Sequence, residues 1–233
     1  MCIVEKLDGW LGRFDYDKLI KHDDDLPVIL KQLDEGKGAF IIGSHLGNME
    51  LLRSISSLNS SGVKRHVDVT AIMEMNSTKY LEVNSKLIPT GKLLDVKGTA
   101  FDFTKPKEIG KDIKQTGVGY DHCYVTEMYN PENPQCGLPL DASDMVQFAK
   151  VKEPVSGHVM EVFTNMEGCQ FYSGNYIGKT IGKNGVEYKA HDAFCLETQC
   201  FPDTPNKPKF PTCILQPGQK MKAKTVYSFY TEK

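Results

Sequence analysis

The sequence lacks a long apolar run, a close pair of cysteines and a strong excess of charge of either sign. No stretch approaches the roughly 18 consecutive apolar residues that cross a bilayer. The first six residues, MCIVEK, lack the basic start and long apolar core of a signal peptide. The formal net charge of −2 gives no reason to expect nucleic acid or an anionic membrane as a partner. We therefore expect a soluble cytoplasmic protein without a membrane span.

The seven cysteines do not form a familiar cysteine site. None of them belongs to a C-x-x-C pair, and an odd count without close pairs argues against a disulfide framework and against a zinc site. The sequence also holds no internal repeat and no low-complexity tract. We expect neither a metal nor another cofactor.

The predicted secondary structure changes near residues 76–79, from α/β to mainly β. The earlier part reads as α/β, with a helix that Asp25 caps and Gly36 ends, a buried strand over 39–42, a second helix from 48 and a second strand over 67–73. After residue 79, Pro and Gly recur and short alternating runs predict strands, among them 159–163, 170–173 and 225–230. We expect an α/β fragment at 1–78 and a mainly β portion at 79–233.

The stretch GSHLGNMELL places His45 at the end of the predicted buried strand and Glu50 in the first turns of the next helix. Folds of the α/β class place reactive groups at this position, and a carboxylate near an imidazole can orient it as a general base for acyl transfer. Alternatively, His45 is a loop histidine and Glu50 is a solvated helix residue. The spacing alone leaves both interpretations open.

The wider stretch LDEGKGAFIIGSHLGNMELLRS resembles the lysophospholipid and lipid A acyltransferase family, whose H-x-x-x-x-D/E motif matches His45 through Glu50. The resemblance covers about the first 75 residues. The family's acceptor-binding and donor-binding segments have no counterpart downstream, and its membrane anchor is absent. The resemblance therefore implies a fragment that is not an active acyltransferase.

Two carboxylates stand out in the later part of the chain. Glu197 follows the apolar or small run 193–196 in HDAFCLETQCFPD, with no basic residue beside it. It is either a buried acceptor paired with backbone amides or a base held for proton transfer. Asp121, in GYDH, suits a turn carboxylate that bonds its own backbone, or a ligand-binding group.

Four spaced segments in this part resemble, in order, the carboxyl-terminal part of the aldose 1-epimerase (galactose mutarotase) family. They are PTGKLLDVKGTAFDF, GYDHCYV, GCQFYSGNY and FCLETQCFPD, and the resemblance runs from about Tyr80 to the end. It implies a mainly β fold: part of a galactose mutarotase-like β-sandwich with an open sugar groove, preceded by the short α/β segment. It also implies that Glu197 is the general base, that Asp121 binds sugar hydroxyls and that Gln170 lies in the groove.

The implied reaction interconverts the α and β anomers of an aldohexose such as galactose or glucose. A base removes the proton of the anomeric hydroxyl and an acid protonates the ring oxygen, so the ring opens, the aldehyde rotates and the ring closes again. One base and one acid suffice, without a metal or a nucleotide. A glutamate with an ordinary pKa of about 4.3 is ionised at neutral pH and can serve as the base.

The matching acid is harder to find. In the epimerase family it is a histidine that lies upstream of the segment matching Tyr80, where this chain carries the acyltransferase-like segment. Of the later histidines, His122, His158 and His191, the first neighbours Asp121, and adjacent strand residues point to opposite faces. We therefore expect impaired activity and a chain that joins two partial genes. A non-catalytic sugar-binding module and an acyltransferase relative using His45 stay open as alternatives.

Four aromatic residues near these carboxylates have two possible roles, as a stacking face for a sugar or as core, and strand spacing favours the core. They are Tyr120, Tyr124, Phe171 and Tyr172. The sequence indicates no oligomeric state.

Overall fold

The structure is a computed structural model that describes residues 70–133, 136–138, 144–178, 180–181 and 187–232. The helices and the strand predicted before residue 70 lie outside the described residues, as do His45 and Glu50. The strands of the two large sheets belong to a compact unit formed by Val67–Thr180 and Tyr188–Lys233. The short strands β9 and β10 each have one residue within these bounds and one outside them. Within the described ranges, no helix is long and apolar enough to cross a membrane.

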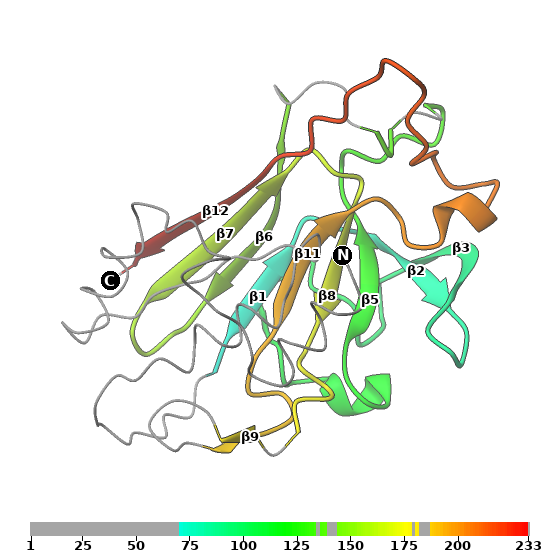
Figure 1. The fold of residues 1–233 in the computed structure, drawn as a ribbon. Coiled ribbons are helices and arrows are strands. Elements are labelled where there is room, and N and C mark those ends of the chain that lie inside the picture. Colours follow the sequence, from blue (N-terminus) through cyan, green and yellow to red (C-terminus); the bar gives the residue numbers. More distant parts are fainter. Residues whose placement is uncertain (1–69, 134–135, 139–143, 179, 182–186, 233) are drawn as a thin grey trace, which may run out of the picture. The chain divides into compact units, whose positions relative to one another are not determined.

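Two five-stranded antiparallel sheets account for most of the regular structure in the described residues (Figure 1). The first sheet has the order β12-β7-β6-β1-β4, with bounds Thr225–Thr231, His158–Thr164, Val146–Lys152, Ile72–Met75 and Lys107–Glu108. The second has the order β11-β8-β5-β2-β3, with bounds Cys195–Gln199, Gly168–Tyr172, Asp121–Val125, Lys79–Val83 and Pro89–Asp95. The short strands β9 (Thr180–Ile181) and β10 (Glu187–Tyr188) pair with each other.

The prediction of a mainly β fold is confirmed. Helical structure in the described ranges consists of two 3₁₀ turns, η1 (Ile113–Thr116) and η3 (Thr204–Asn206). The runs predicted as strands form β7, β8 and β12 within a residue or two of their expected bounds. A turn precedes β12, since the Gln219 amide donates to the Gln216 carbonyl over 3.0 Å.

Strand β1 pairs along its whole length with β6, although it precedes the domain boundary expected near residue 78. Its neighbour on the other side is β4. The strand predicted over 67–73 therefore overlaps an observed strand, and that strand belongs to the first sheet. The division at residue 78 itself stays a prediction, because residues 1–69 lie outside the described part.

The two sheets share one apolar core. Successive side chains of a strand point to opposite faces, so every second residue of each strand reaches the space between the sheets. Met73, Phe148 and Val162 enter it from the first sheet. From the second sheet and the residue before β5 come Tyr120, Tyr124, Phe171 and Leu196. Burial of one such large side chain contributes about 1.5–3 kcal/mol, so this cluster is the main source of stability.

The core prediction is confirmed for three of the four aromatics named above. Tyr120, Tyr124 and Phe171 are fully buried, and the rings of Tyr120 and Phe171 stack with centroids 4.9 Å apart. Tyr172 differs because it lies one residue further along β8 and therefore faces the other side of the sheet.

A buried carboxylate ties three segments together beside the second sheet. Glu167, just before β8, is fully buried. Its carboxylate accepts hydrogen bonds from the Phe201 amide at 3.0 Å and from the Cys136 thiol at 3.2 Å. Its own carbonyl accepts the amide of Thr126. Burial raises the pKa of Glu167, because the ionised form loses its hydration.

Gly168, the first residue of β8, has no room for a side chain. A Cβ atom there would lie 2.8 Å from Cys123 Sγ and 3.1 Å from the Phe201 ring. Both neighbours are buried, so neither can move away cheaply. We predict that Gly168→Ala lowers the free energy of unfolding by about 1–3 kcal/mol, as overpacking does. Urea denaturation followed by circular dichroism measures it, with Gly110→Ala as the control, since a Cβ at Gly110 meets nothing within 4 Å. Equal stability of the two variants would contradict the packing argument.

The raised pKa of Glu167 predicts a pH dependence of stability. The folded state binds this proton more tightly than the unfolded state, so the contribution of Glu167 to stability falls as the pH rises from the ordinary glutamate pKa of about 4.3 through the raised value. Glu167→Gln removes the titration. Its stability relative to the parent should therefore improve as the pH rises from 4 towards neutrality, measured by urea unfolding at several pH values.

Glu153→Gln serves as a control, because the pKa of Glu153 is shifted in the opposite direction from that of Glu167. Hydrogen bonds from the side chain and amide of Ser156 lower the pKa of Glu153. This variant should therefore lose stability relative to the parent as the pH rises from the lowered value through the ordinary glutamate pKa of about 4.3, so its urea series extends below pH 4. The same trend in both variants would contradict the assignment of the pKa shift to burial of Glu167.

Candidate functional site

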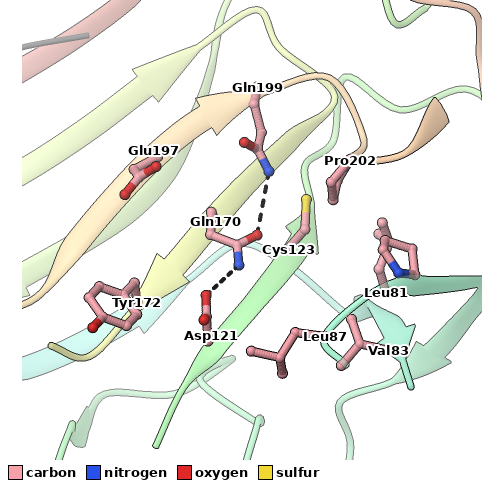
Figure 2. A pocket seen from close by; sticks show the side chains of 11 residues that line it. Leu81, Val83, Leu87, Asp121, Cys123, Gln170, Tyr172, Glu197, Gln199 and Pro202 are labelled. Atoms are coloured by element: carbon pink, nitrogen blue, oxygen red, sulfur yellow. Dashed lines mark hydrogen bonds between the residues drawn. The ribbon is translucent and has the colours of Figure 1, made fainter. Parts of the chain in front are cut away.

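A cavity of about 300 Å³ opens on the face of the second sheet that points away from the core (Figure 2). One side of its lining is polar and the other is apolar. The polar or polarisable side chains are Asp121, Cys123, Gln170, Tyr172, Glu197 and Gln199. The apolar wall consists of Leu81, Val83, Leu87, Pro89 and Pro202.

The alternation of the strands places the polar side chains together. β8 is the central strand of three, with β5 on one side and β11 on the other. In the register of the sheet, Gln170 lies opposite Cys123 of β5 and opposite Glu197 of β11. Because neighbours such as Tyr124, Phe171 and Leu196 enter the core, the residues beside them must face the cavity. The structure thus brings the three predicted site residues, Asp121, Gln170 and Glu197, to one surface.

Asp121 is the first residue of β5, and its carboxylate is held by a side chain. Gln170 Nε2 donates to Asp121 Oδ1 over 2.8 Å. Among the described residues, no backbone amide donates to this carboxylate, so Asp121 does not act as a turn residue that bonds its own backbone. The hydrogen bond fixes one carboxylate oxygen and leaves the other for a ligand.

Glu197 lies in the middle of β11, and its half-buried carboxylate is unpaired. Within the described ranges, no side chain and no backbone amide donates a hydrogen bond to it, and no cation forms an ion pair with it. This differs from the alternative of a buried acceptor satisfied by backbone amides. Figure 2 shows Glu197 on the same side of the sheet as Gln170 and Tyr172. A half-buried, unpaired carboxylate is available to accept a proton or a hydroxyl hydrogen bond.

Gln199 is a site residue that the sequence analysis missed. It lies two positions after Glu197 on β11 and therefore faces the same cavity. Its Nε2 donates to Gln170 Oε1 over 3.4 Å. The alternation in CLETQ contains this information, since it places Leu196 in the core with Glu197 and Gln199 on either side of a single threonine.

No histidine of the described segments lines the cavity. His122 lies on the opposite face from Asp121, as the alternation predicts, and packs edge-on against Phe101 at 4.6 Å between ring centroids. Burial lowers the pKa of His122. His158 contacts the Ser156 hydroxyl, and His191 contacts the Ser173 carbonyl. These three histidines have other partners than a ligand in this cavity.

The arrangement suits a small polyhydroxylated ligand. One carboxylate oxygen of Asp121 and the amide of Gln170 offer an acceptor and a donor side by side, while the apolar wall can cover a face without hydroxyl groups. Tyr172 adds the edge of an aromatic surface, and its hydroxyl oxygen accepts the Tyr176 amide at 2.9 Å. Glu197 adds a second carboxylate. The cavity thus combines hydrogen-bonding groups with a carboxylate that can accept a proton.

The sequence is similar to those of known sugar epimerases. A protein-family model for aldose 1-epimerase matches residues 58–228, which is more than half of the chain. The galactose mutarotase of Homo sapiens is 41% identical over 152 residues, which is 64% of this chain and 41% of that protein. The aldose 1-epimerase of Escherichia coli is 29% identical over 167 residues, covering 69% of this chain and 45% of that protein. The chain therefore spans less than half the length of these relatives.

Solved structures agree with the sequence comparison. An aldose epimerase homologue from C. elegans superimposes with a TM-score of 0.58 and 25% sequence identity, covering 70% of this chain and 46% of that chain. A galactose 1-epimerase from Lactobacillus acidophilus gives a TM-score of 0.52 and 26% identity, with 70% and 44% coverage. Fold, family model and relatives agree, and the chain belongs to the aldose 1-epimerase family.

Proposed function

We propose that this chain binds an aldohexose in the cavity on the second sheet and interconverts its α and β anomers. One observation carries the proposal: Asp121, Gln170 and Glu197, the positions that match the family's site segments, lie around a single cavity. The Glu197 carboxylate has no hydrogen-bond donor there among the described residues. Relatives named galactose mutarotase and aldose 1-epimerase support the substrate class. Galactose is the first sugar to test.

In this proposal Glu197 is the general base. Its carboxylate takes the proton of the anomeric hydroxyl, the bond between the anomeric carbon and the ring oxygen breaks, and an acid gives a proton to the ring oxygen. The resulting aldehyde rotates. On closure the open-chain hydroxyl attacks the aldehyde and returns its proton to that acid, while Glu197 returns its proton to the new anomeric oxygen. Proton transfer by one positioned side chain contributes about 10²- to 10⁴-fold to such a rate.

Asp121 and Gln170 bind the sugar in the proposed complex. The oxygen of Asp121 that does not accept from Gln170 accepts a hydrogen bond from a sugar hydroxyl, and the second N–H of Gln170 donates to a sugar oxygen. These contacts are the same before and after ring opening if they involve hydroxyl groups far from the anomeric carbon. They therefore set affinity more than turnover.

The acid that protonates the ring oxygen is not assigned to a described residue. The family's acid is a histidine, and no described histidine lines the cavity. For this reason the non-catalytic alternative, a sugar-binding module, is tested by the same experiments. Binding without turnover is its expected result.

Three finer expectations remain proposals. The chain is cytoplasmic, residues 1–78 contain an acyltransferase-like segment with His45 and Glu50, and the epimerase-like portion follows that segment. The pairing of β1 and the family match from residue 58 both support an earlier start of the epimerase-like portion than residue 79.

Replacing Glu197 tests the base. We predict that Glu197→Gln slows mutarotation by about 100-fold or more, because the amide cannot take the anomeric proton. Affinity for galactose should change by no more than a few-fold, since the shape of the site is kept. Polarimetry of freshly dissolved α-D-galactose measures the rate. Glu161→Gln, in β7 of the other sheet, is the matched control and should retain the parent rate.

Two other outcomes of this experiment are informative. Equal rates of the Glu197→Gln variant and the parent, both above the uncatalysed rate, would contradict the role of Glu197. A parent that binds galactose but does not accelerate its mutarotation would identify a binding module.

Replacing Asp121 tests sugar recognition. We predict that Asp121→Ala weakens galactose binding by about 10- to 100-fold, because it removes a hydrogen bond to a charged group and leaves Gln170 without its acceptor. Isothermal titration calorimetry measures the dissociation constant. Asp95→Ala is the control, since this exposed carboxylate pairs with Lys79 at the far end of β3. Unchanged affinity of the Asp121 variant would place the sugar elsewhere.

A further inference from the structure

We propose that Gln199 is a positioning residue of the sugar site, which holds the Gln170 amide in the orientation that recognises the sugar. The proposal rests on the proposed function for the identity of the ligand. It deepens that function by assigning a role to a residue outside the trio Asp121, Gln170 and Glu197.

Three polar side chains form a diagonal row across β11, β8 and β5. Gln199 Nε2 donates to Gln170 Oε1 over 3.4 Å, and Gln170 Nε2 donates to Asp121 Oδ1 over 2.8 Å (Figure 2). In the register of the sheet, Gln199 lies opposite Gly168 and Gln170 lies opposite Cys123, so each hydrogen bond runs to a diagonal neighbour. Long side chains can span such diagonal pairs. Gln170 is therefore held at both ends of its amide.

In this row each hydrogen bond is donated in the same direction, from Gln199 to Gln170 and from Gln170 to Asp121. The two ends of a glutamine amide are similar in size, so packing alone does not distinguish its two orientations. In the observed orientation, the nitrogen of Gln170 faces a carboxylate and its oxygen faces an N–H group of Gln199. In the reversed orientation, an oxygen would face the carboxylate of Asp121 and a nitrogen would face the nitrogen of Gln199. Asp121, whose ionised carboxylate can only accept, favours the observed orientation, and an N–H group of Gln199 directed at the Gln170 oxygen supports it.

Gly168 lies opposite Gln199 in the sheet. Gln199 faces a residue without a side chain, and a Cβ at Gly168 would approach the Gln199 carbonyl to 3.3 Å and Cys123 Sγ to 2.8 Å. The Gln199 side chain also interacts with the thiol of Cys123. Burial raises the pKa of Cys123 to about 12, and hydrogen bonding by Gln199 acts in the opposite direction. The site therefore keeps Gln199 between Cys123 and Gln170.

The orientation of Gln170 matters for a sugar. With its oxygen occupied by Gln199 and one N–H by Asp121, the remaining N–H is a donor beside the second oxygen of Asp121, which is an acceptor. A donor beside an acceptor matches two neighbouring hydroxyl groups of a sugar. The 3.4 Å contact from Gln199 is longer than the 2.8 Å contact to Asp121, so it is the weaker of the two hydrogen bonds of the Gln170 amide.

The test uses the variants Gln199→Met and Gln199→Glu, which keep the length of the side chain but cannot donate to Gln170. Nitrogen-15 NMR of the side-chain amides should show the Gln170 resonances shifted and its amide protons exchanging faster in both variants. Galactose binding measured by calorimetry should weaken by about 2- to 10-fold. In an active chain, KM should rise by the same factor with kcat changed by less than twofold. Gln147→Met, in β6 of the other sheet, is the matched control and should retain both properties of the parent.

A double-variant cycle decides whether Gln199 acts through Gln170. In the Gln170→Met background, Gln199→Met should have no further effect on affinity, because its target is absent. Unchanged Gln170 resonances in the single variants, or full additivity of the two substitutions in the cycle, would overturn the role of Gln199. The proposed function would still stand in that case, provided that the parent binds galactose. A parent that does not bind galactose would overturn the proposed function and the role of Gln199 in sugar recognition. The amide spectrum would then decide whether Gln199 orients Gln170.

Discussion

The alternation of side chains along β5, β8 and β11 is the constraint on which both the stability and the site depend. In each strand, one set of residues enters the core and the other set lines the cavity. Tyr124 and Leu196 are examples of the first set, and Asp121 and Glu197 of the second. A shift of one residue in the register of any of these strands would exchange the two sets and destroy core and site together. The aromatic core therefore fixes the positions of the polar groups.

The carboxylates of Asp121 and Glu197 are open to a ligand because they have few hydrogen-bond partners in the described residues. Asp121 has one hydrogen-bond donor, Gln170, and Glu197 has none among the described residues. A carboxylate buried without a partner would be costly, but these two are half-exposed at an open cavity, where water can solvate them until a ligand binds. The fully buried Glu167 shows the contrast, since it is satisfied by an amide and a thiol and serves to hold the segment that continues into the apolar wall at Pro202.

Part of this account could be predicted from the sequence. Local alternation located β7, β8 and β12, and a family resemblance selected Asp121, Gln170 and Glu197. The order of the strands could not be derived in the same way, because pairs such as β1 with β6 join residues far apart in the chain. Gln199 and Glu167 were missed for different reasons. Alternation does place Gln199 beside Glu197, whereas nothing in the sequence around Glu167 distinguishes a buried carboxylate from a solvated one.

In the proposed complex, the outer face of β5, β8 and β11 binds an aldohexose with its anomeric hydroxyl at Glu197. A crystal structure of the chain with galactose would show this arrangement. We expect the anomeric oxygen within about 2.6–3.2 Å of the Glu197 carboxylate, with other hydroxyl groups on Asp121 and Gln170. A galactose bound on another surface, or one that presents its anomeric carbon away from Glu197, would rule the proposed complex out.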